Sequence, residues 1–198
     1  MRVYFARHGQ SEANILRVIS NRGWKHPLTD LGRAQAQALA ERLTGEGITH
    51  IISSPVMRAV QTAEILASAL GLPFTTAEAL RENDNGSLEG RSDQAAWQEY
   101  DRAVTAWING DEAARIADGE SLLDCRNRFV PFIRGLITAH LAQSDRILLV
   151  AHGGLYRAVL PDVLENIDKP FSWSHPLENA GMVVSEARAG QLVCLAWD

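Results

Sequence analysis

Two strand-like segments of the sequence end in a histidine that is followed by glycine. They are "VYFARHG" and "ILLVAHGG". The carboxyl ends of neighbouring parallel strands meet at one edge of a sheet, where α/β proteins bind their ligands. If these strands are neighbours, His8 and His152 face one crevice, and Gly9 and Gly153 let the backbone approach a ligand closely. The alternative is that each histidine simply ends a strand at the surface, which is the commoner case for a single histidine.

Two arginines add positive charge to the same edge. Arg7 directly precedes His8, and Arg58 falls in the first turn of the helix expected after the second strand. Free N–H groups and the helix dipole favour an anion there, and a guanidinium fork matches the oxygens of a phosphate. We therefore predict a phosphoryl-binding pocket. The alternative for Arg58 is a solvent-facing position on its helix.

The elements that position these residues follow from an alternation of short and long segments. Short segments rich in β-branched or aromatic residues predict strands at 2–6, 50–54, 73–77, 146–151 and 182–187. Between them, one helix is expected after the cap Thr29, and another with Ser54 as its N-cap and Pro55 as its first residue. This order predicts a three-layer α/β/α fold with a mostly parallel central sheet.

Residues 91–143 break this alternation, because they hold two helical patterns and no convincing strand. We expect a helical insertion here, within a single domain that spans 1–198. Pro131 lies inside the second pattern and is expected to kink or interrupt that helix. Three aromatic residues of the segment have a spacing typical of a buried core face: Trp97, Tyr100 and Trp107.

The composition excludes several classes of protein. A chain of 198 residues with 46% hydrophobic and 22% charged residues is typical of a globular protein. The net charge of -5 argues against a nucleic-acid or membrane-surface partner. Because the sequence has neither an export signal nor a long apolar run, we expect a cytoplasmic protein. Cys125 and Cys194 lack metal-ligand spacing and are expected to be reduced, buried thiols.

Six segments resemble, in the same order, the signature blocks of the histidine phosphatase superfamily, also called phosphoglycerate mutase-like. They are "ARHGQSEAN", "PLTDLGRAQA", "SSPVMRAVQTAE", "LRENDNGSLEG", "GESLLDCRNRF" and "VAHGG". A bare Arg-His-Gly occurs by chance, whereas six blocks that cover nearly the whole chain form a strong match. The resemblance implies phosphoryl transfer from a small-molecule phosphate ester, with no cofactor and no metal.

The resemblance implies a role for each charged residue of the predicted pocket. His8 would attack phosphorus in line and become a phosphohistidine, for which its ring must be neutral. Arg7, Arg58 and His152 would hold the equatorial oxygens, where positioning and charge carry most of the catalysis. His152 would work best protonated. Arg7 beside it lowers its pKa and the bound dianion raises it, so the sequence leaves the balance open.

Further positions are expected to contact the substrate. Asn14 matches a position that commonly touches the phosphoryl group in the family, and Ser11 is a second candidate. The alternative for both is capping or turn formation after the first strand. Arg22 and its neighbouring loop cations are either contacts for a second anionic group or simply solvated.

The leaving oxygen needs a proton, and two carboxylates of one loop compete for this role. Glu82 matches the family's general acid, and Asp84 is the nearest rival. The family often has aromatic residues where this loop has Asn85 and Leu88, so we expect a leaving-group pocket that is less closed or shaped for a different alcohol. Four other histidines follow no ligand spacing and are expected at the surface, with the last nearest the site: His26, His50, His140 and His175.

Three functions are compatible with these residues. They are a phosphomonoesterase, a mutase that returns the phosphoryl group to its substrate, and a non-catalytic binding protein on the same fold. The segment "GQLVCLAWD" near the end of the sequence predicts a final strand and not a mobile cover, so water should reach the intermediate. We therefore favour the phosphomonoesterase. A homodimer stays open beside a monomer.

Overall fold

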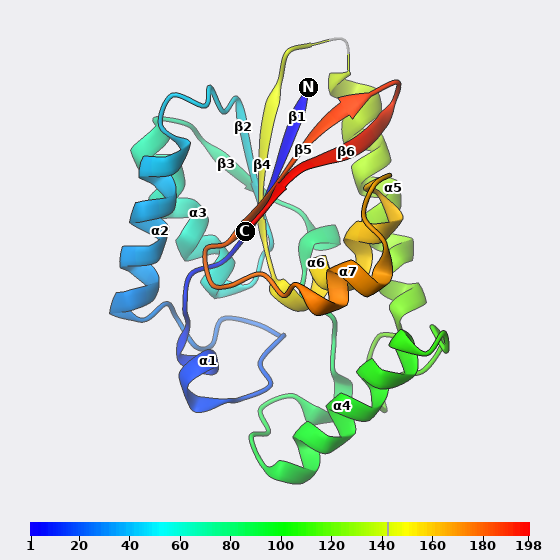
Figure 1. The fold of residues 1–198 in the computed structure, drawn as a ribbon. Coiled ribbons are helices and arrows are strands. Elements are labelled where there is room, and N and C mark those ends of the chain that lie inside the picture. Colours follow the sequence, from blue (N-terminus) through cyan, green and yellow to red (C-terminus); the bar gives the residue numbers. More distant parts are fainter. Residues whose placement is uncertain (142) are drawn as a thin grey trace.

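The computed structural model describes residues 1–141 and 143–198, and its centre is a six-stranded sheet with helices on both faces (Figure 1). The strands are β1 (Arg2–Arg7), β2 (His50–Ser53), β3 (Phe74–Thr76), β4 (Arg146–Ala151), β5 (Met182–Arg188) and β6 (Gln191–Trp197). The α-helices are α1 (Glu12–Leu16), α2 (Asp30–Leu43), α3 (Met57–Leu70), α4 (Gln94–Ile108), α5 (Leu122–His140), α6 (Gly153–Val159) and α7 (Lys169–Ser174). Short 3-10 turns lie at Glu78–Leu80, Gly86–Leu88 and Leu160–Asp162.

The strand order across the sheet is β3-β2-β4-β1-β5-β6. The first four strands of this order run parallel, whereas β5 is antiparallel to β1 and β6 is antiparallel to β5. The predicted, mostly parallel sheet is confirmed. Because β1 and β4 pair directly, the residues that follow these two strands emerge together at one edge of the sheet.

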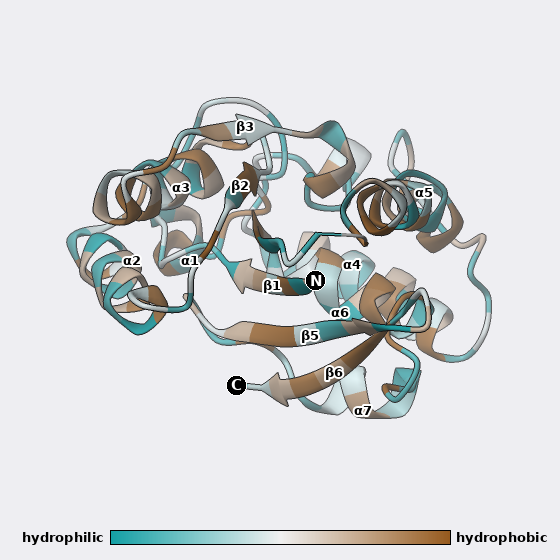
Figure 2. Ribbon diagram, turned by 90° about the horizontal axis from the view of Figure 1, so that it is seen from above, coloured by the Kyte–Doolittle hydropathy of each residue, from teal (hydrophilic) through white to brown (hydrophobic). Residues whose placement is uncertain are grey.

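Successive side chains of β1 point to opposite faces of the sheet, so this strand contacts the helices on both faces. Tyr4 and Ala6 pack with buried residues of α2 and α3, whereas Val3 and Phe5 pack with buried residues of α5 and α6. Figure 2 shows the sheet from above between these two helical layers. Burying each large apolar side chain contributes roughly 1.5–3 kcal/mol. The predicted three-layer α/β/α fold is confirmed.

The two helices expected within 91–143 are α4 and α5, and they lie in different places. The helix α5 packs on the sheet, with the ring centroids of Phe129 and Phe5 6.4 Å apart. It runs through Pro131 without interruption, because the buried face around Phe129 and Ile133 outweighs the hydrogen bond that proline removes. The helix α4 lies beyond the edge of the sheet where β1 and β4 end (Figure 1).

The start of α3 differs from the prediction. The helix begins at Met57 with Val56 as its N-cap residue, so Ser54 lies two residues before the cap. The Ser54 hydroxyl accepts a hydrogen bond from the Val56 N–H at 3.2 Å and lies 2.8 Å from a ring nitrogen of His152. The serine therefore joins α3 to the strand end that carries His152.

Two further expectations concern the cysteines and membrane spans. Both thiols are free, and Cys125 is buried as expected, but Cys194 is only partly buried on the edge strand β6. Within 1–141 and 143–198, no helix combines the length and the apolar character that a membrane span requires.

Candidate active site

The strands β1 and β4 bring two histidines to one edge of the sheet. Arg7 is opposite Ala151 in the β1–β4 register, and the His8 backbone N–H donates to the Ala151 carbonyl at 3.0 Å. The ring centroids of His8 and His152 are 5.2 Å apart, with 63° between the ring planes. The two side chains are 3% and 0% exposed. The structure therefore brings together the two histidines that the strand ends pointed to.

Both ring nitrogens of His8 are engaged, and this fixes its tautomer. Nδ1 lies 2.6 Å from the Gly9 carbonyl, which can only accept, so Nδ1 carries the proton. Nε2 accepts a hydrogen bond from Nε of Arg58 at 2.9 Å. Burial, followed by the charges of Arg58 and Arg7, holds the pKa of His8 well below its usual 6.5. His8 is thus a neutral imidazole with the Nε2 lone pair available for attack on an electrophile.

Two guanidinium groups face this imidazole, and both are largely removed from water. Arg58 is the second residue of α3 and is 4% exposed; its Nη1 donates to the Ser20 carbonyl at 2.6 Å. Burial lowers the pKa of Arg58 to about 10, so the group stays charged at neutral pH. Arg7 donates Nη1 to the Leu177 carbonyl at 2.6 Å, and burial lowers its pKa as well.

His152 carries a ring nitrogen without a partner. Its Nε2 lies 2.8 Å from the Ser54 hydroxyl, whereas Nδ1 is buried and has no hydrogen bond with any described residue. Burial, followed by the charges of Arg58 and His8, lowers the pKa of His152 well below 6.5. In the ligand-free protein the ring is therefore neutral. A phosphoryl dianion beside it would favour the protonated form.

Unpaired buried nitrogens gather in this part of the molecule. Within the described residues, three buried side-chain nitrogens lack a hydrogen-bond partner: Arg7 Nε, His152 Nδ1 and Arg157 Nε. An unsatisfied buried donor costs roughly 1–3 kcal/mol, so each such atom calls for a ligand. The two arginine nitrogens can only donate, and His152 Nδ1 donates to an oxygen when it carries a proton. This donor set is that of an anion site.

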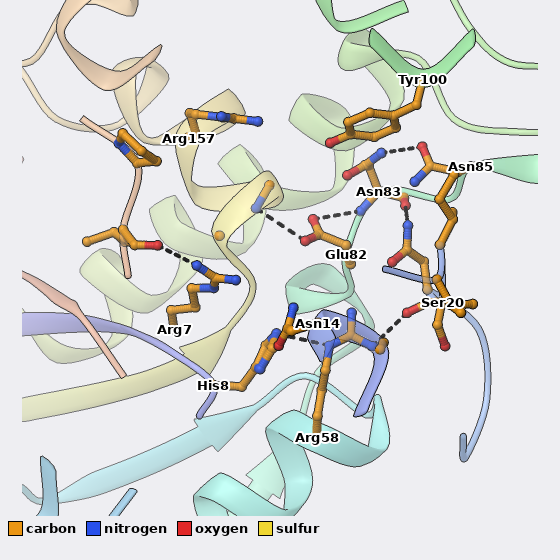
Figure 3. Close-up of a pocket in the computed structure, with 18 of the residues that line it drawn as sticks. Arg7, His8, Asn14, Ser20, Arg58, Glu82, Asn83, Asn85, Tyr100 and Arg157 are labelled. Carbon is orange, nitrogen blue, oxygen red and sulfur yellow. Dashed lines mark hydrogen bonds between the residues drawn. The ribbon is translucent and has the colours of Figure 1, made fainter. Parts of the chain in front are cut away.

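The residues surround a cavity of about 270 Å³, shown in Figure 3. Its wall opposite the imidazole carries one carboxylate, that of Glu82. Oε1 accepts hydrogen bonds from the N–H groups of Leu155 at 2.6 Å and Asn83 at 3.1 Å, and Oε2 accepts from Gly154 at 3.2 Å. Three backbone donors thus fix a carboxylate at the cavity wall, where it can exchange a proton with a bound ligand.

Residues 3–198 match the family model described as the histidine phosphatase superfamily, branch 1. The chain belongs to this superfamily. The probable phosphoglycerate mutase GpmB of Yersinia pestis is 37% identical over 83% of this chain and 75% of its own length. The protein of the same name from Proteus mirabilis is 38% identical over the same shares.

Solved structures of histidine phosphatases share the fold. A mycobacterial glucosyl-3-phosphoglycerate phosphatase in complex with VO3 is 26% identical, with a TM-score of 0.84 over 99% of this chain and 98% of that chain. The alpha-ribazole phosphatase of Shigella flexneri is 24% identical, with a TM-score of 0.82 over 100% and 96% of the two chains. The second likeness concerns the fold alone.

Within this member of the superfamily, the loop 82–85 separates the two competing carboxylates. Glu82 lines the cavity, whereas Asp84 turns away from it and pairs with Arg22 at 2.8 Å. The Asp84 carboxylate also accepts the Gly86 N–H at 2.8 Å. Arg22 is therefore occupied by Asp84, is 43% exposed in its side chain, and is not among the residues that line the cavity. The structure does not bring Arg22 to the cavity, because the salt bridge to Asp84 holds its guanidinium outside.

Asn14 and Ser11, the two expected substrate contacts after the first strand, occupy different positions in the structure. Asn14 lines the cavity, and its Oδ1 accepts hydrogen bonds from the N–H and the hydroxyl of Ser11 at 2.9 and 3.1 Å. These bonds leave the amide nitrogen as the group that Asn14 can offer to a ligand. Ser11 is fully buried as the N-cap of α1 and does not line the cavity, so the capping alternative describes its position.

The two glycines of the prediction have different neighbours. A Cβ on Gly153 would lie 3.0 Å from Nε of Arg7, so this glycine gives room to the guanidinium at the cavity wall. A Cβ on Gly9 would lie 2.3 Å from the carbonyl oxygen of Gly32 at the start of α2. Gly9 thus permits close contact between two backbone segments and fixes His8 through its carbonyl, and it does not itself line the cavity.

The aromatic residues of α4 correct the expected core face. Trp107 is buried in the core at 4% exposure, as predicted, but Trp97 and Tyr100 line the cavity. Their rings contact one another edge to face at 5.5 Å, and Trp97 Nε1 donates to the Arg17 carbonyl at 2.9 Å. The helix lies beyond the edge of the sheet (Figure 1), so one helical face meets the core at Trp107 and the cavity at Trp97 and Tyr100.

Sequence reasoning missed Arg157, which lines the cavity from α6. It lies one helical turn after Gly153, and that spacing from the "AHGG" segment is the signal that points to it. His175, expected near the site, is exposed and stacks on Phe171 at 4.1 Å between ring centroids. The residues that line the cavity from this segment are instead Pro176 and Leu177.

Two of the remaining histidines meet at the opposite edge of the sheet. His50, His140 and Asp145 each offer an atom within 4.8 Å of the others. His140 Nδ1 lies 2.7 Å from the Asp145 carboxylate, and His50 Nδ1 lies 2.9 Å from the Thr49 hydroxyl. These hydrogen bonds account for the grouping without a further ligand.

Proposed function

We propose that the protein is a metal-independent phosphomonoesterase that acts through a phosphohistidine on a small phosphate ester. The observation that carries the proposal is the neutral His8, whose Nε2 points at the guanidinium of Arg58. Nε2 is the nucleophile, and Arg58 is the group that would receive the phosphoryl oxygens beside it. Arg7 and His152 add buried, unpaired nitrogens to the same site.

The first transfer forms a bond between His8 Nε2 and phosphorus and breaks the bond from phosphorus to the ester oxygen. As the phosphoryl group arrives, Arg58 transfers its Nε–H donation from the imidazole to a phosphoryl oxygen. Charge on the equatorial oxygens is stabilised by Arg7, Arg58 and His152. Glu82 gives its proton to the departing alcohol oxygen, because an alcohol leaves far more readily than an alkoxide.

The second transfer consumes the intermediate. Water attacks phosphorus and its proton passes to the Glu82 carboxylate, while the bond from phosphorus to His8 breaks and inorganic phosphate is released. Among the described residues, β6 pairs with β5 in the sheet and does not line the cavity. This arrangement favours access of water to the intermediate.

Mutase-type transfer is a second candidate, favoured by the 37% identity to a protein named as a probable phosphoglycerate mutase. Both reactions share the phosphohistidine and differ only in the acceptor. Incubation with 3-phosphoglycerate, with and without 2,3-bisphosphoglycerate, followed by ³¹P NMR, separates them. We expect inorganic phosphate with little 2-phosphoglycerate. Efficient isomerisation with negligible free phosphate would replace the hydrolase by the mutase.

A further inference from the structure

Glu82 lies in the loop 82–85, which belongs to no helix or strand. Its side chain points into the cavity (Figure 3), where the carboxylate accepts hydrogen bonds from the N–H groups of Gly154 and Leu155 at 3.2 and 2.6 Å. A segment outside helices and strands is placed by the partners that its backbone N–H and C=O groups find. The position of the acid therefore depends on what holds the backbone of this loop.

Arg128 and Glu120 form an ion pair that contacts this loop. Nε of Arg128 donates to Oε1 of Glu120 at 2.9 Å, and Nη2 donates to Oε2 at 3.1 Å. Arg128 belongs to α5, which packs on the sheet, and Glu120 directly precedes the N-cap of the same helix. The two side chains are 19% and 26% exposed. A guanidinium that binds both oxygens of a carboxylate is held in one orientation, so the pair is a rigid support.

The pair binds backbone atoms on both sides of Glu82. Arg128 donates to the carbonyls of Ala79 and Glu82, at 2.8 and 3.3 Å. The Glu120 carboxylate accepts the Asp84 N–H at 2.9 Å, and the Glu120 N–H donates to the Asp84 carbonyl at 2.8 Å. The backbone from 79 to 84 is thus fixed to the start of α5 through these two residues.

The pair itself lies outside the cavity. Neither Arg128 nor Glu120 is among the residues that line it. Burial raises the pKa of Glu120, but the hydrogen bonds and the charge of Arg128 outweigh burial and hold that pKa below its usual value. The carboxylate therefore stays ionised and bound to the guanidinium. Any effect of the pair on the reaction must pass through the loop.

We propose that Arg128 is a positioning residue for the general acid, acting through Glu120 and the backbone of the loop 82–85. Proton transfer from Glu82 to a leaving oxygen needs a heavy-atom distance of about 2.6–3.2 Å. A misplacement of about 1 Å can cost roughly 10²-fold in rate. Release of the loop backbone therefore impairs proton donation and leaves the nucleophile and its phosphoryl-binding arginines in place. The inference rests on the phosphomonoesterase function proposed above.

The dependence of the rate on the leaving group tests this role. Arg128→Met removes every donor to the loop and keeps an unbranched side chain in the same place. It should lower kcat/KM for glycerol 3-phosphate by about 10- to 100-fold. It should lower kcat/KM for nitrophenyl phosphate by less than about threefold, because that leaving group departs without a proton. Equal losses for the two esters, or no loss for either, would overturn the proposal.

Arg126 of the same helix supplies a matched control. It forms salt bridges with Glu112 and Asp162, and within the described residues it has no hydrogen bond or salt bridge to the loop 82–85. Arg126→Met thus removes partly buried ion pairs from α5 and should keep the wild-type ratio of the two kcat/KM values. The change of ratio expected for Arg128→Met, if it also appeared in Arg126→Met, would indicate a general loss of stability and overturn the proposal.

The conservative variant separates the fork from the charge. Arg128→Lys keeps the positive charge but cannot bind both oxygens of Glu120 and the loop carbonyls at once. We expect it to recover part of the rate on glycerol 3-phosphate that Arg128→Met loses. A rate no higher than that of Arg128→Met would contradict the role of the charge in holding the loop. If Arg128→Met does not fold, Arg128→Lys takes its place and should show the same asymmetry in weaker form.

Amide NMR locates the Glu82 carboxylate without any turnover. The ¹H–¹⁵N signals of Gly154 and Leu155, which donate to this carboxylate, should shift in Arg128→Met. They should also shift in Glu82→Gln and stay in place in Arg126→Met. Unchanged signals in Arg128→Met would overturn the inference. If no ester is cleaved, including nitrophenyl phosphate, the hydrolase proposal is wrong, and these signals still decide whether Arg128 places the carboxylate.

Discussion

Nε of Arg58 donates a hydrogen bond to Nε2 of His8 over 2.9 Å, and these two residues are only 4% and 3% exposed. The guanidinium therefore occupies the lone pair that the nucleophile needs, and at the same time keeps a proton from binding there. Arg58 holds the imidazole neutral and aimed until a phosphoryl group competes for the same donor.

The first prediction concerns the protonation of His8. Burial and the charges of Arg58 and Arg7 lower its pKa, so the ring should stay neutral, with the proton on Nδ1, at pH values well below 6.5. The ¹⁵N chemical shifts of histidine-labelled protein report tautomer and charge, and His8→Asn assigns the signals. An imidazolium signal from His8 at pH 6.5 would contradict the prediction.

The second prediction concerns stability against pH. The pKa values of His8 and His152 are lowered in the folded protein, whereas both titrate near 6.5 when unfolded. The unfolded chain thus binds more protons below pH 6.5. The free energy of unfolding should be unaffected above that pH and should fall below it, by up to about 1.4 kcal/mol per pH unit for each histidine.

Urea unfolding between pH 7.5 and 5.5 measures this dependence. His152→Asn should reduce the slope of the unfolding free energy with pH, because one of the two buried rings is removed. His175→Asn is the matched control, since His175 is exposed, and should leave the slope as in the wild type. An equal slope in His152→Asn would exclude this ring as a source of the effect.

The third prediction is that His8 carries the phosphoryl group during turnover. Phosphohistidine survives alkaline quenching and is destroyed by acid, so mass spectrometry after an alkaline quench with a slow substrate should locate phosphate on this residue. His8→Ala should lose turnover by about 10³-fold or more. Phosphate found on a serine, or turnover retained by the variant, would remove His8 as the nucleophile.

The fourth prediction separates Glu82 from Asp84. Glu82→Gln should slow the cleavage of alkyl phosphates by roughly 10² to 10⁴. It should slow phosphorylation by nitrophenyl phosphate less, because that leaving group departs without a proton. Asp84→Asn lies outside the cavity and should show no such asymmetry. The reverse pattern would assign the acid role to Asp84.

The fifth prediction tests how the backbone holds the acid. A Cβ on Gly154 would lie 2.8 Å from Oε1 of Glu82, so Gly154→Ala should displace the carboxylate. Alkyl phosphates should again be affected more than nitrophenyl phosphate. Gly135→Ala on α5 meets nothing within 4 Å and serves as the control. Equal rates for both variants would show that Glu82 tolerates the methyl group.

Much of the fold could be predicted from the sequence because its signals are local. The strands follow from short apolar runs, and the boundaries of β4 agree with the prediction at both ends. His8 and His152 could be predicted to lie together because two strand-like segments both end in a histidine that is followed by glycine. Their meeting then required only that β1 and β4 be neighbours, which the sheet provides.

The rest depends on contacts between distant segments. Nothing near Arg22 in the sequence indicates that Asp84 neutralises it, since the two residues lie in different loops, 62 positions apart. The side of α4 that meets the cavity depends on where that helix lies beyond the sheet, so the periodicity of Trp97 and Tyr100 could not separate core from cavity. Periodicity reports burial, and a cavity wall is also buried.

The position of β1 in the sheet has a consequence for synthesis. Both partners of β1 come late in the chain, since β4 begins at Arg146 and β5 at Met182. A nascent chain shorter than this carries an apolar strand with two open edges, which invites chaperone binding or pairing with another chain. His8 is synthesised well before these two strands, yet its surroundings form only after β4 and β5 have left the ribosome.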